Sequence, residues 1–123
     1  TRAALEGICY QVYDVLMAME NDIHAKPKEI RVDGGAIANN FLMQFQADIC
    51  RCPVVRPRVL ETTALGAAYL AGLAIGYWKD VDELKAQWAL DNIFSAEMHE
   101  ETAETLLTEW HKAVGRSLNW AAD

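Results

Sequence analysis

The chain has 123 residues, of which 52% are hydrophobic and 24% are charged, and its formal net charge is −7. This length and composition fit one globular domain with its own core and exclude a disordered or low-complexity chain. The negative charge excludes a protein that binds nucleic acid through a basic face, because such binding depends on counterion release by clustered Lys and Arg.

Residues 3–23 predict one long helix, because apolar side chains recur there at intervals of three and four. The apolar stripe expected to be buried consists of Leu5, Cys9, Val12, Leu16, Met19 and Ile23. Pro27 breaks the pattern, and the helix is expected to end before it. Residues 29–33 then predict a strand with Ile30 and Val32 on one face.

The most informative segment is 30–42, IRVDGGAIANNFL, in which the strand leads into Asp33, two glycines and a second helical pattern. Open α/β sheets bind ligands at this end of a strand. Gly34 and Gly35 permit positive φ and close approach of the main chain to a ligand. The unpaired N–H groups of the next helix favour a polar or anionic group. The pattern favours a nucleotide-type turn, although Gly-Gly also serves plain strand-to-helix turns.

The second helix is predicted over 36–50, with one buried side. The residues of that side are Ile37, Phe41, Leu42, Phe45 and Ile49. Asn39 lies just past the glycines, so its amide could reach a ligand at the turn, or it could cap the helix or face solvent. The flanking prolines of segment 54–57 predict a brief strand. Arg56 and Arg58 beside these prolines could bind phosphate, but solvated arginines are the commoner case.

A third helix is predicted over 63–77, with a threonine cap after Glu61. No charge occurs in 62–78, which raises the alternative of a membrane span. The glycines and the short length favour a central helix packed on a sheet instead. A short helix is predicted to start at Asp80, and a last helix is predicted over 100–120. Acids at the start of the last helix and cations later in it match the helix dipole.

Cysteine and histidine usage predicts no metal site. Cys50 and Cys52 form a C-x-C pair without a nearby histidine, and Cys9 is isolated. We therefore expect reduced thiols in a cytoplasmic protein. The chain begins with Thr1 and shows no signal peptide, and we expect it to be a piece of a longer protein.

Two long runs resemble the FGGY family of carbohydrate kinases, and within it the glycerol kinases. Residues 31–48, RVDGGAIANNFLMQFQAD, are similar to the family's adenosine-binding segment, and residues 61–74, ETTALGAAYLAGLA, are also typical of the family. The first helix and the spacing of Trp110, Ala113 and Trp120 fit as well. The resemblance covers nearly the whole chain and is strongest over 30–78.

The resemblance implies an α/β fold, namely a partial RNase H-like (actin-type ATPase) domain with two short strands, flanking helices and a helix-rich C-terminal tail. Residues 1–123 would be the C-terminal part of the second, nucleotide-binding domain of the kinase, with 80–123 as a helical tail of that domain. The kinase would convert ATP and glycerol, with Mg²⁺, to sn-glycerol 3-phosphate and ADP. The residues that bind glycerol and magnesium and the general base would lie outside this chain, which alone would be inactive.

The resemblance also implies which residues contact the nucleotide. In glycerol kinases these are the second glycine of the pair and the Asn four residues later, which match Gly35 and Asn39, while Gly34 supports the turn. No catalytic residue and no metal ligand is assigned to this chain, and Asp33 is interpreted as structural. In some bacterial members the segment before the last helix docks a regulatory protein, but the acidic segment 95–105 does not match that pattern well.

The expected partners are ATP and ADP, with glycerol bound by preceding residues and with neither nucleic acid nor membrane involved. We also expect a homo-oligomer. Two alternatives stay open. A related pentose or hexose kinase would share the Gly-Gly turn. As an isolated chain, the protein could instead be a non-catalytic module that self-associates through an open sheet edge and exposed apolar surface.

Overall fold

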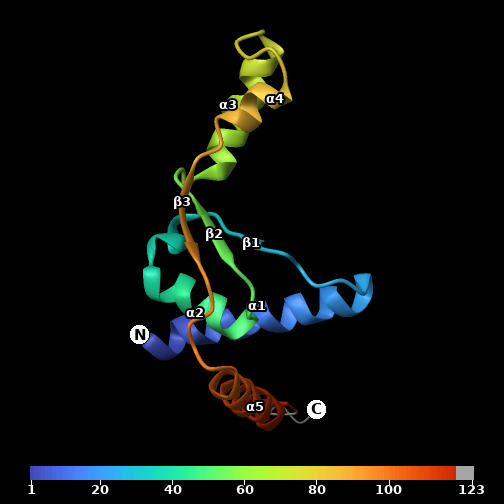
Figure 1. The fold of residues 1–123 in the computed structure, drawn as a ribbon, viewed down its shortest axis with the longest axis vertical. Coiled ribbons are helices and arrows are strands. Elements are labelled where there is room, and N and C mark those ends of the chain that lie inside the picture. The colour runs from blue at the N-terminus through green and yellow to red at the C-terminus, as the bar shows by residue number, and fades with distance from the viewer. Residues whose placement is uncertain (119–123) are drawn as a thin grey trace.

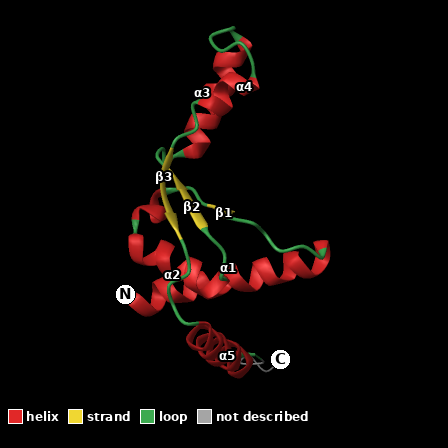
Figure 2. Ribbon diagram, in the orientation of Figure 1, coloured by secondary structure: helices red, strands yellow, loops and turns green. Residues whose placement is uncertain are grey.

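The computed structural model describes residues 1–118. The elements along the chain are α1 (Arg2–Ile23), β1 (Ile30–Arg31), a 3₁₀ helix η1 (Gly35–Ala38), α2 (Asn40–Cys50), β2 (Val54–Pro57), α3 (Thr62–Ala74), α4 (Val81–Ala86), β3 (Leu90–Phe94) and α5 (Glu100–Ser117). The sheet, α1, α2 and α5 form a body, and α3 and α4 form an arm that extends away from it (Figures 1 and 2). Trp120 and the expected helix end there lie outside the described residues.

The sheet has three strands in the order β1-β2-β3. β1 runs parallel to β2, with Ile30 opposite Val54, and β3 runs antiparallel to β2, with Phe94 opposite Val54. The mixed α/β fold and the brief strand at 54–57 are confirmed. The β1 pairing extends past the strand, because the Val32 N–H donates to the Val55 carbonyl at 3.2 Å.

The third strand was not predicted. β3 lies inside the segment expected to be a helical tail, and all its residues except Phe94 are exposed. Asp91 and Asn92 interrupt its apolar character, so no strand pattern is visible in the sequence. Its pairing with β2 brings a distant segment to the sheet and makes β2 the central strand.

The core lies where α1, α2, α5 and the sheet meet. Its buried residues are Cys9, Tyr10, Ile37, Leu42, Met43, Phe45, Ala47, Ile49, Val54, Phe94, Ala103 and Leu107. The expectation that the whole α1 stripe is buried is wrong for its second half, because Val12, Met19 and Ile23 are 36%, 53% and 64% exposed. The cause is geometric, since α2 covers only part of this 22-residue helix.

Polar contacts fasten α5 to the rest of the body. Asp48 on α2 is buried, and its Oδ1 accepts hydrogen bonds from the backbone N–H groups of Glu97 at 2.7 Å and Met98 at 3.0 Å, just before α5 begins. The Trp110 ring stacks on Tyr10 with 5.2 Å between centroids. These contacts, together with the buried Ala103 and Leu107, place the first half of α5 against the body, whereas Val114 in its second half and Leu118 just after it are exposed.

Helix α3 does not pack on the sheet as predicted. Its apolar residues occupy all sides rather than one face, and Leu70 is 72% exposed. Gly72 is the one α3 residue that is buried, and a Cβ there would lie 2.1 Å from the Trp78 ring. The chain therefore folds back on α3 at Trp78, whose ring also meets Tyr69 edge-on at 5.2 Å.

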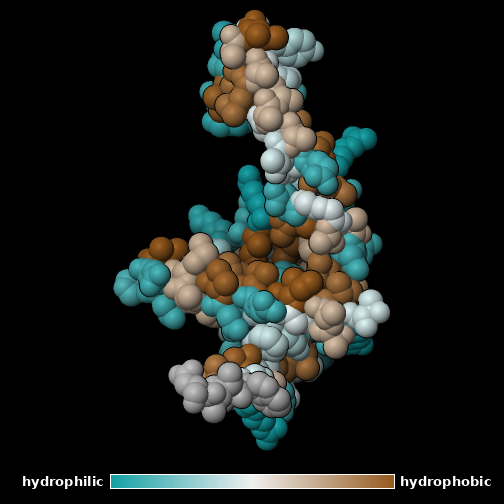
Figure 3. Space-filling model, turned by 180° about the vertical axis from the view of Figure 1, so that it is seen from behind, coloured by the Kyte–Doolittle hydropathy of each residue, from teal (hydrophilic) through white to brown (hydrophobic). Residues whose placement is uncertain are grey.

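Apolar side chains gather both over the body and along the arm on the face seen in Figure 3. The exposed large hydrophobic residues of the arm include Leu70, Ile75 and Tyr77. Within residues 1–118, no helix is both long and apolar enough to cross a membrane.

Candidate functional site

The glycine pair forms a bend between β1 and η1. Gly34 has φ 86° and ψ 167°, a combination that residues with a Cβ very rarely adopt. Its N–H donates to the Leu60 carbonyl at 2.8 Å, and its carbonyl accepts from the Ile37 N–H at 3.2 Å. Backbone conformation therefore explains why position 34 is glycine.

Gly35 differs from Gly34 because its conformation is not left-handed. A Cβ built on Gly35 would have Glu61 Oε1 as its nearest contact, at 4.0 Å, which is an ordinary van der Waals separation. The residue is also exposed. Neither packing nor backbone strain within residues 1–118 therefore explains the glycine, and the space in front of its main chain is open to a molecule from outside.

Asn39 is the N-cap of α2 rather than a residue within the predicted helix 36–50, which is divided into η1 and α2. Its Oδ1 accepts a hydrogen bond from the Leu42 N–H at 3.2 Å, and its own N–H donates to the Ala36 carbonyl at 3.1 Å. The capping role that the sequence left open is therefore present. Because the cap uses Oδ1, the exposed side chain can still donate through Nδ2.

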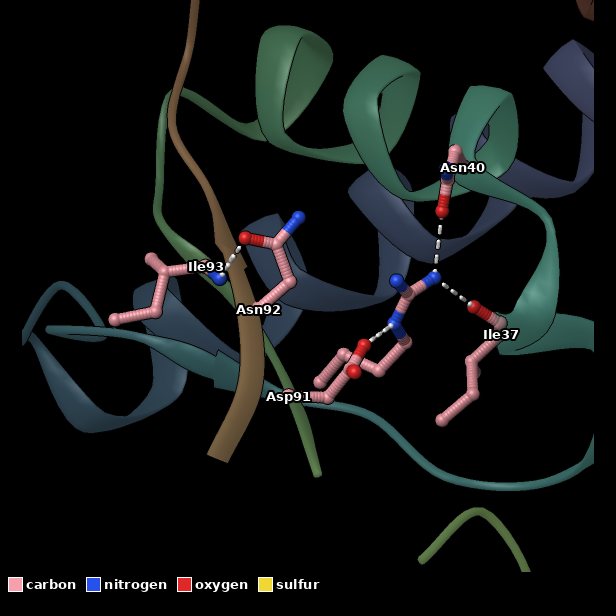
Figure 4. A network of polar contacts seen from close by, with 6 residues as sticks. Ile37, Asn40, Asp91, Asn92 and Ile93 are labelled. Carbon is pink, nitrogen blue, oxygen red and sulfur yellow. Dashed lines mark hydrogen bonds and ion pairs between the residues drawn. The ribbon is translucent and has the colours of Figure 1, made fainter. Parts of the chain in front are cut away.

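Arg56 on β2 holds the far end of the η1 turn, which the sequence did not reveal. Its Nη1 donates to the Ile37 carbonyl at 3.0 Å and to Asn40 Oδ1 at 2.8 Å, and its Nε donates to Asp91 Oδ2 at 2.7 Å (Figure 4). The side chain is only 12% exposed, so the expectation of a solvated arginine is wrong here. These partners lie 16 to 35 residues away in sequence, so no local pattern could identify them.

Two clefts lie near the turn but not over its glycines. A cleft of about 800 Å³ separates the sheet from the arm, and one of about 300 Å³ adjoins it. Asp33 and Thr62 line the smaller cleft, whereas Gly34, Gly35 and Asn39 line neither. The structure thus brings the three predicted site residues together on an open part of the surface.

The thiols are free and buried or partly buried. Burial raises the pKa of Cys9 to about 12 and that of Cys50 to about 11. Both are therefore protonated near neutral pH and are poor nucleophiles and poor metal ligands. Among residues 1–118, no group of three or more His, Cys, Asp or Glu side chains is placed to hold a metal ion.

In this chain two parallel strands are connected through a glycine bend and a capped helix, and further helices surround them. This arrangement is that of part of an RNase H-like, actin-type ATPase domain. Residues 1–75 match the model of the C-terminal domain of the FGGY family of carbohydrate kinases. The chain belongs to this family.

The individual proteins to which the chain is similar include several glycerol kinases. The chain is 87% identical to a glycerol kinase of Parabacteroides distasonis over 98% of its own length and 24% of that protein. A crystal structure of Plasmodium falciparum glycerol kinase with ADP superposes with a TM-score of 0.81 at 34% identity, covering 98% of this chain and 24% of that one. The crystal structure of a ligand-bound xylulose kinase from Lactobacillus acidophilus superposes with a TM-score of 0.73 at 27% identity, covering 97% of this chain and 24% of that one. The chain therefore spans about a quarter of the length of the curated relatives it matches.

Proposed function

We propose that this chain forms part of the adenosine-binding site of an ATP-dependent glycerol kinase, which converts ATP and glycerol to sn-glycerol 3-phosphate and ADP. The observation that carries the proposal is the open, exposed main chain at Gly35, for which the protein's own packing gives no reason. The 87% identity to a glycerol kinase supports the choice of reaction, and the ADP in the superposing crystal structure supports a nucleotide as the ligand.

The geometry of each residue supports the role that we propose for it. Gly34 sets the bend, Gly35 lets the nucleoside lie against the main chain, and Asn39 Nδ2 donates to the nucleotide from the N-terminus of α2. Phosphoryl transfer depends on positioning more than on covalent chemistry. Binding energy gathered at the adenosine, away from the reacting phosphate, can fix the angle at which the glycerol hydroxyl attacks.

Magnesium would accompany ATP and neutralise charge on its phosphates. We propose that the protein ligands of this magnesium lie outside this chain. The three free cysteines support a reducing location, and we propose a cytoplasmic enzyme.

The reaction is tested with the product of the whole reading frame that contains this chain. We expect ATP-dependent phosphorylation of glycerol and little turnover of xylulose. Phosphorylation of xylulose in preference to glycerol would instead support a pentose kinase, the second candidate, which the structural likeness to xylulose kinase favours. The absence of turnover with both substrates would contradict both assignments.

The nucleotide site is tested separately in a chimera. In it, the matching 121 residues of the Parabacteroides distasonis glycerol kinase are replaced by those of this chain. We expect Gly35→Val to raise the KM for ATP by about tenfold or more while the KM for glycerol stays unchanged, because the added side chain fills the space in front of the bend. A normal KM for ATP and a normal kcat in this variant would contradict the proposed site.

A third behaviour, self-association, is expected of the isolated chain. The outer edge of β1 has no strand partner within residues 1–118, and apolar side chains are exposed on the arm. We propose that the 123-residue chain alone is inactive and associates with itself. Size-exclusion chromatography with light scattering tests this, and a stable monomer at micromolar concentration would contradict it.

A further inference from the structure

We propose that Arg56 is a positioning residue for the nucleotide: it fixes the η1 turn so that Gly35 and Asn39 face the ligand in one arrangement. The inference rests on the proposed function and adds to it a residue that itself touches no substrate. It comes from the polar network in Figure 4, where partners from three elements surround the guanidinium of Arg56.

The contacts of Arg56 lie on both sides of Asn39. Nη1 donates to the carbonyl of Ile37, two residues before Asn39, and to Oδ1 of Asn40, the residue after it. One terminal nitrogen therefore fixes the end of η1 and the first residue of α2 at once. The peptide that carries Asn39 lies between these two fixed points, so its orientation depends on Arg56.

Arg56 is itself held from the sheet side. Its Nε pairs with Asp91 on β3 at 2.7 Å, and its guanidinium lies 5.0 Å from the centroid of the Phe94 ring. A guanidinium that is only 12% exposed and held by a carboxylate and an aromatic ring has little rotamer freedom. The stiffness of the β2–β3 pair is therefore transmitted to the turn through this side chain.

The turn needs such a support because its own bonds are few. Within η1 the Ile37 N–H donates to the Gly34 carbonyl at 3.2 Å and the Asn39 N–H donates to the Ala36 carbonyl at 3.1 Å. Hydrogen bonds of 3₁₀ type have poorer geometry than those of an α-helix, and the glycines at the start of the turn, Gly34 before η1 and Gly35 as its first residue, add backbone freedom. Without Arg56 a ligand would have to order the turn when it binds. The free-energy cost of that ordering would be subtracted from the binding free energy, and the affinity for the ligand would fall.

The kinetic test uses the chimeric kinase described above. We expect Arg56→Ala to raise the KM for ATP about tenfold, while kcat and the KM for glycerol each change by less than about twofold. In Arg56→Lys the KM for ATP should rise less than in Arg56→Ala. The lysine ammonium can reach some of the acceptors, but it cannot bond to all of them at once as the planar guanidinium does. Asp91→Asn, which acts on the turn only through Arg56, should raise the KM for ATP by about threefold. The matched control is Arg58→Ala, an exposed cation two residues along, which should leave the KM for ATP unchanged.

A second measurement on the 123-residue chain is independent of catalysis. Hydrogen exchange at the amides of Ile37 and Asn39 should be faster in Arg56→Ala than in the unmodified chain, with core amides such as that of Ile49 unchanged. The inference is overturned if exchange at the turn does not change, if the KM values for ATP and glycerol rise equally, or if Arg58→Ala matches Arg56→Ala. An inactive chimera carrying the unmodified chain would contradict the proposed function instead, and the exchange comparison would still decide whether Arg56 holds the turn.

Discussion

The hydroxyl of Thr62 donates a hydrogen bond to the carboxylate of Asp33, which joins the first residue of α3 to the residue before the glycine pair. The backbone bond from Gly34 to Leu60 lies beside it. Thr62 is therefore not the predicted threonine cap, because the N-cap of α3 is Glu61 and forms no side-chain cap bond. The contact agrees with the interpretation of Asp33 as structural, and it couples the base of the arm to the bend.

We expect Thr62→Val to lower the free energy of unfolding by about 1 kcal/mol, because it removes one hydrogen bond to a charged but solvent-accessible group. Urea unfolding of the 123-residue chain measures this change. Hydrogen exchange at Gly34 should accelerate at the same time, since the bend loses its link to α3. Thr63→Val is the matched control, because Thr63 is exposed and adjacent. Equal effects of the two substitutions would show that the hydrogen bond from Thr62 to Asp33 does not contribute to stability.

The two glycines should respond differently to alanine. Gly34→Ala should cost about 2 kcal/mol of unfolding free energy, because φ 86° with ψ 167° is strained for any residue with a Cβ. Gly35→Ala should be neutral or stabilising by about 0.5 kcal/mol, because its Cβ meets nothing closer than 4.0 Å and the unfolded chain loses freedom. Thermal and urea unfolding of both variants test the contrast. A large loss at Gly35 would mean that folding, rather than a ligand, requires that glycine.

The capping and ligand roles of Asn39 can be separated by substitution. Asn39→Ser keeps an oxygen that can accept from the Leu42 N–H, so stability should change by less than about 0.5 kcal/mol. It removes the amide donor, so the KM for ATP in the chimeric kinase should rise about tenfold with the KM for glycerol unchanged.

Asn39→Ala is the comparison variant, since it removes the cap and the amide donor together. It should raise the KM for ATP to a similar extent and leave the KM for glycerol nearly unchanged. It should also lower the free energy of unfolding by about 1 kcal/mol. If the Ser variant binds ATP normally and only the Ala variant does not, Asn39 acts through the cap alone.

The elements that local periodicity determines could be predicted from the sequence. Helices α1, α2 and α5 carry apolar residues at helical spacing, and the prolines around β2 mark a short strand. The glycine bend was also recognisable, because adjacent glycines after a strand are rare enough to draw attention. What these signals share is that the informative residues lie within one turn or one strand of each other.

The missed features depend on contacts between distant segments. β3 is a strand because β2 offers it a partner, not because Asp91 and Asn92 favour one. The role of Arg56 needs Asp91, 35 residues away, to be in place. Helix α3 gave no face to predict, because it is apolar all round, and the sequence could not indicate that it leaves the sheet. The burial of the second half of α1 was overestimated for the same reason, because Ile23 lies beyond the part of α1 that α2 covers.

The contact between α1 and α5 should make stability depend on pH in acid. Asp14 accepts hydrogen bonds from Trp110 Nε1 at 2.8 Å and pairs with His111 Nε2 at 2.8 Å. Partial burial raises the pKa of Asp14, but the bonds from Trp110 and His111 outweigh that effect and leave its pKa below the usual 3.8. A carboxyl whose folded pKa is lowered stabilises the folded state above its unfolded pKa, and this contribution is lost as the pH falls through the folded value.

We therefore expect the unmodified chain to be more stable than Asp14→Asn at pH 5 to 7, with the difference shrinking as the pH falls through the folded pKa of Asp14, which lies below the usual 3.8. The difference should be modest and should decrease in 1 M salt, because the Asp14 side chain is 40% exposed. Urea unfolding at several pH values measures it, with Asp22→Asn, an exposed acid on the same helix, as the control. Parallel pH curves for the unmodified chain and Asp14→Asn would show that this carboxylate does not fasten α5 to α1. In that case the attachment would depend on the other contacts of α5, namely the stacking of Trp110 on Tyr10 and the bonds from Glu97 and Met98 to Asp48.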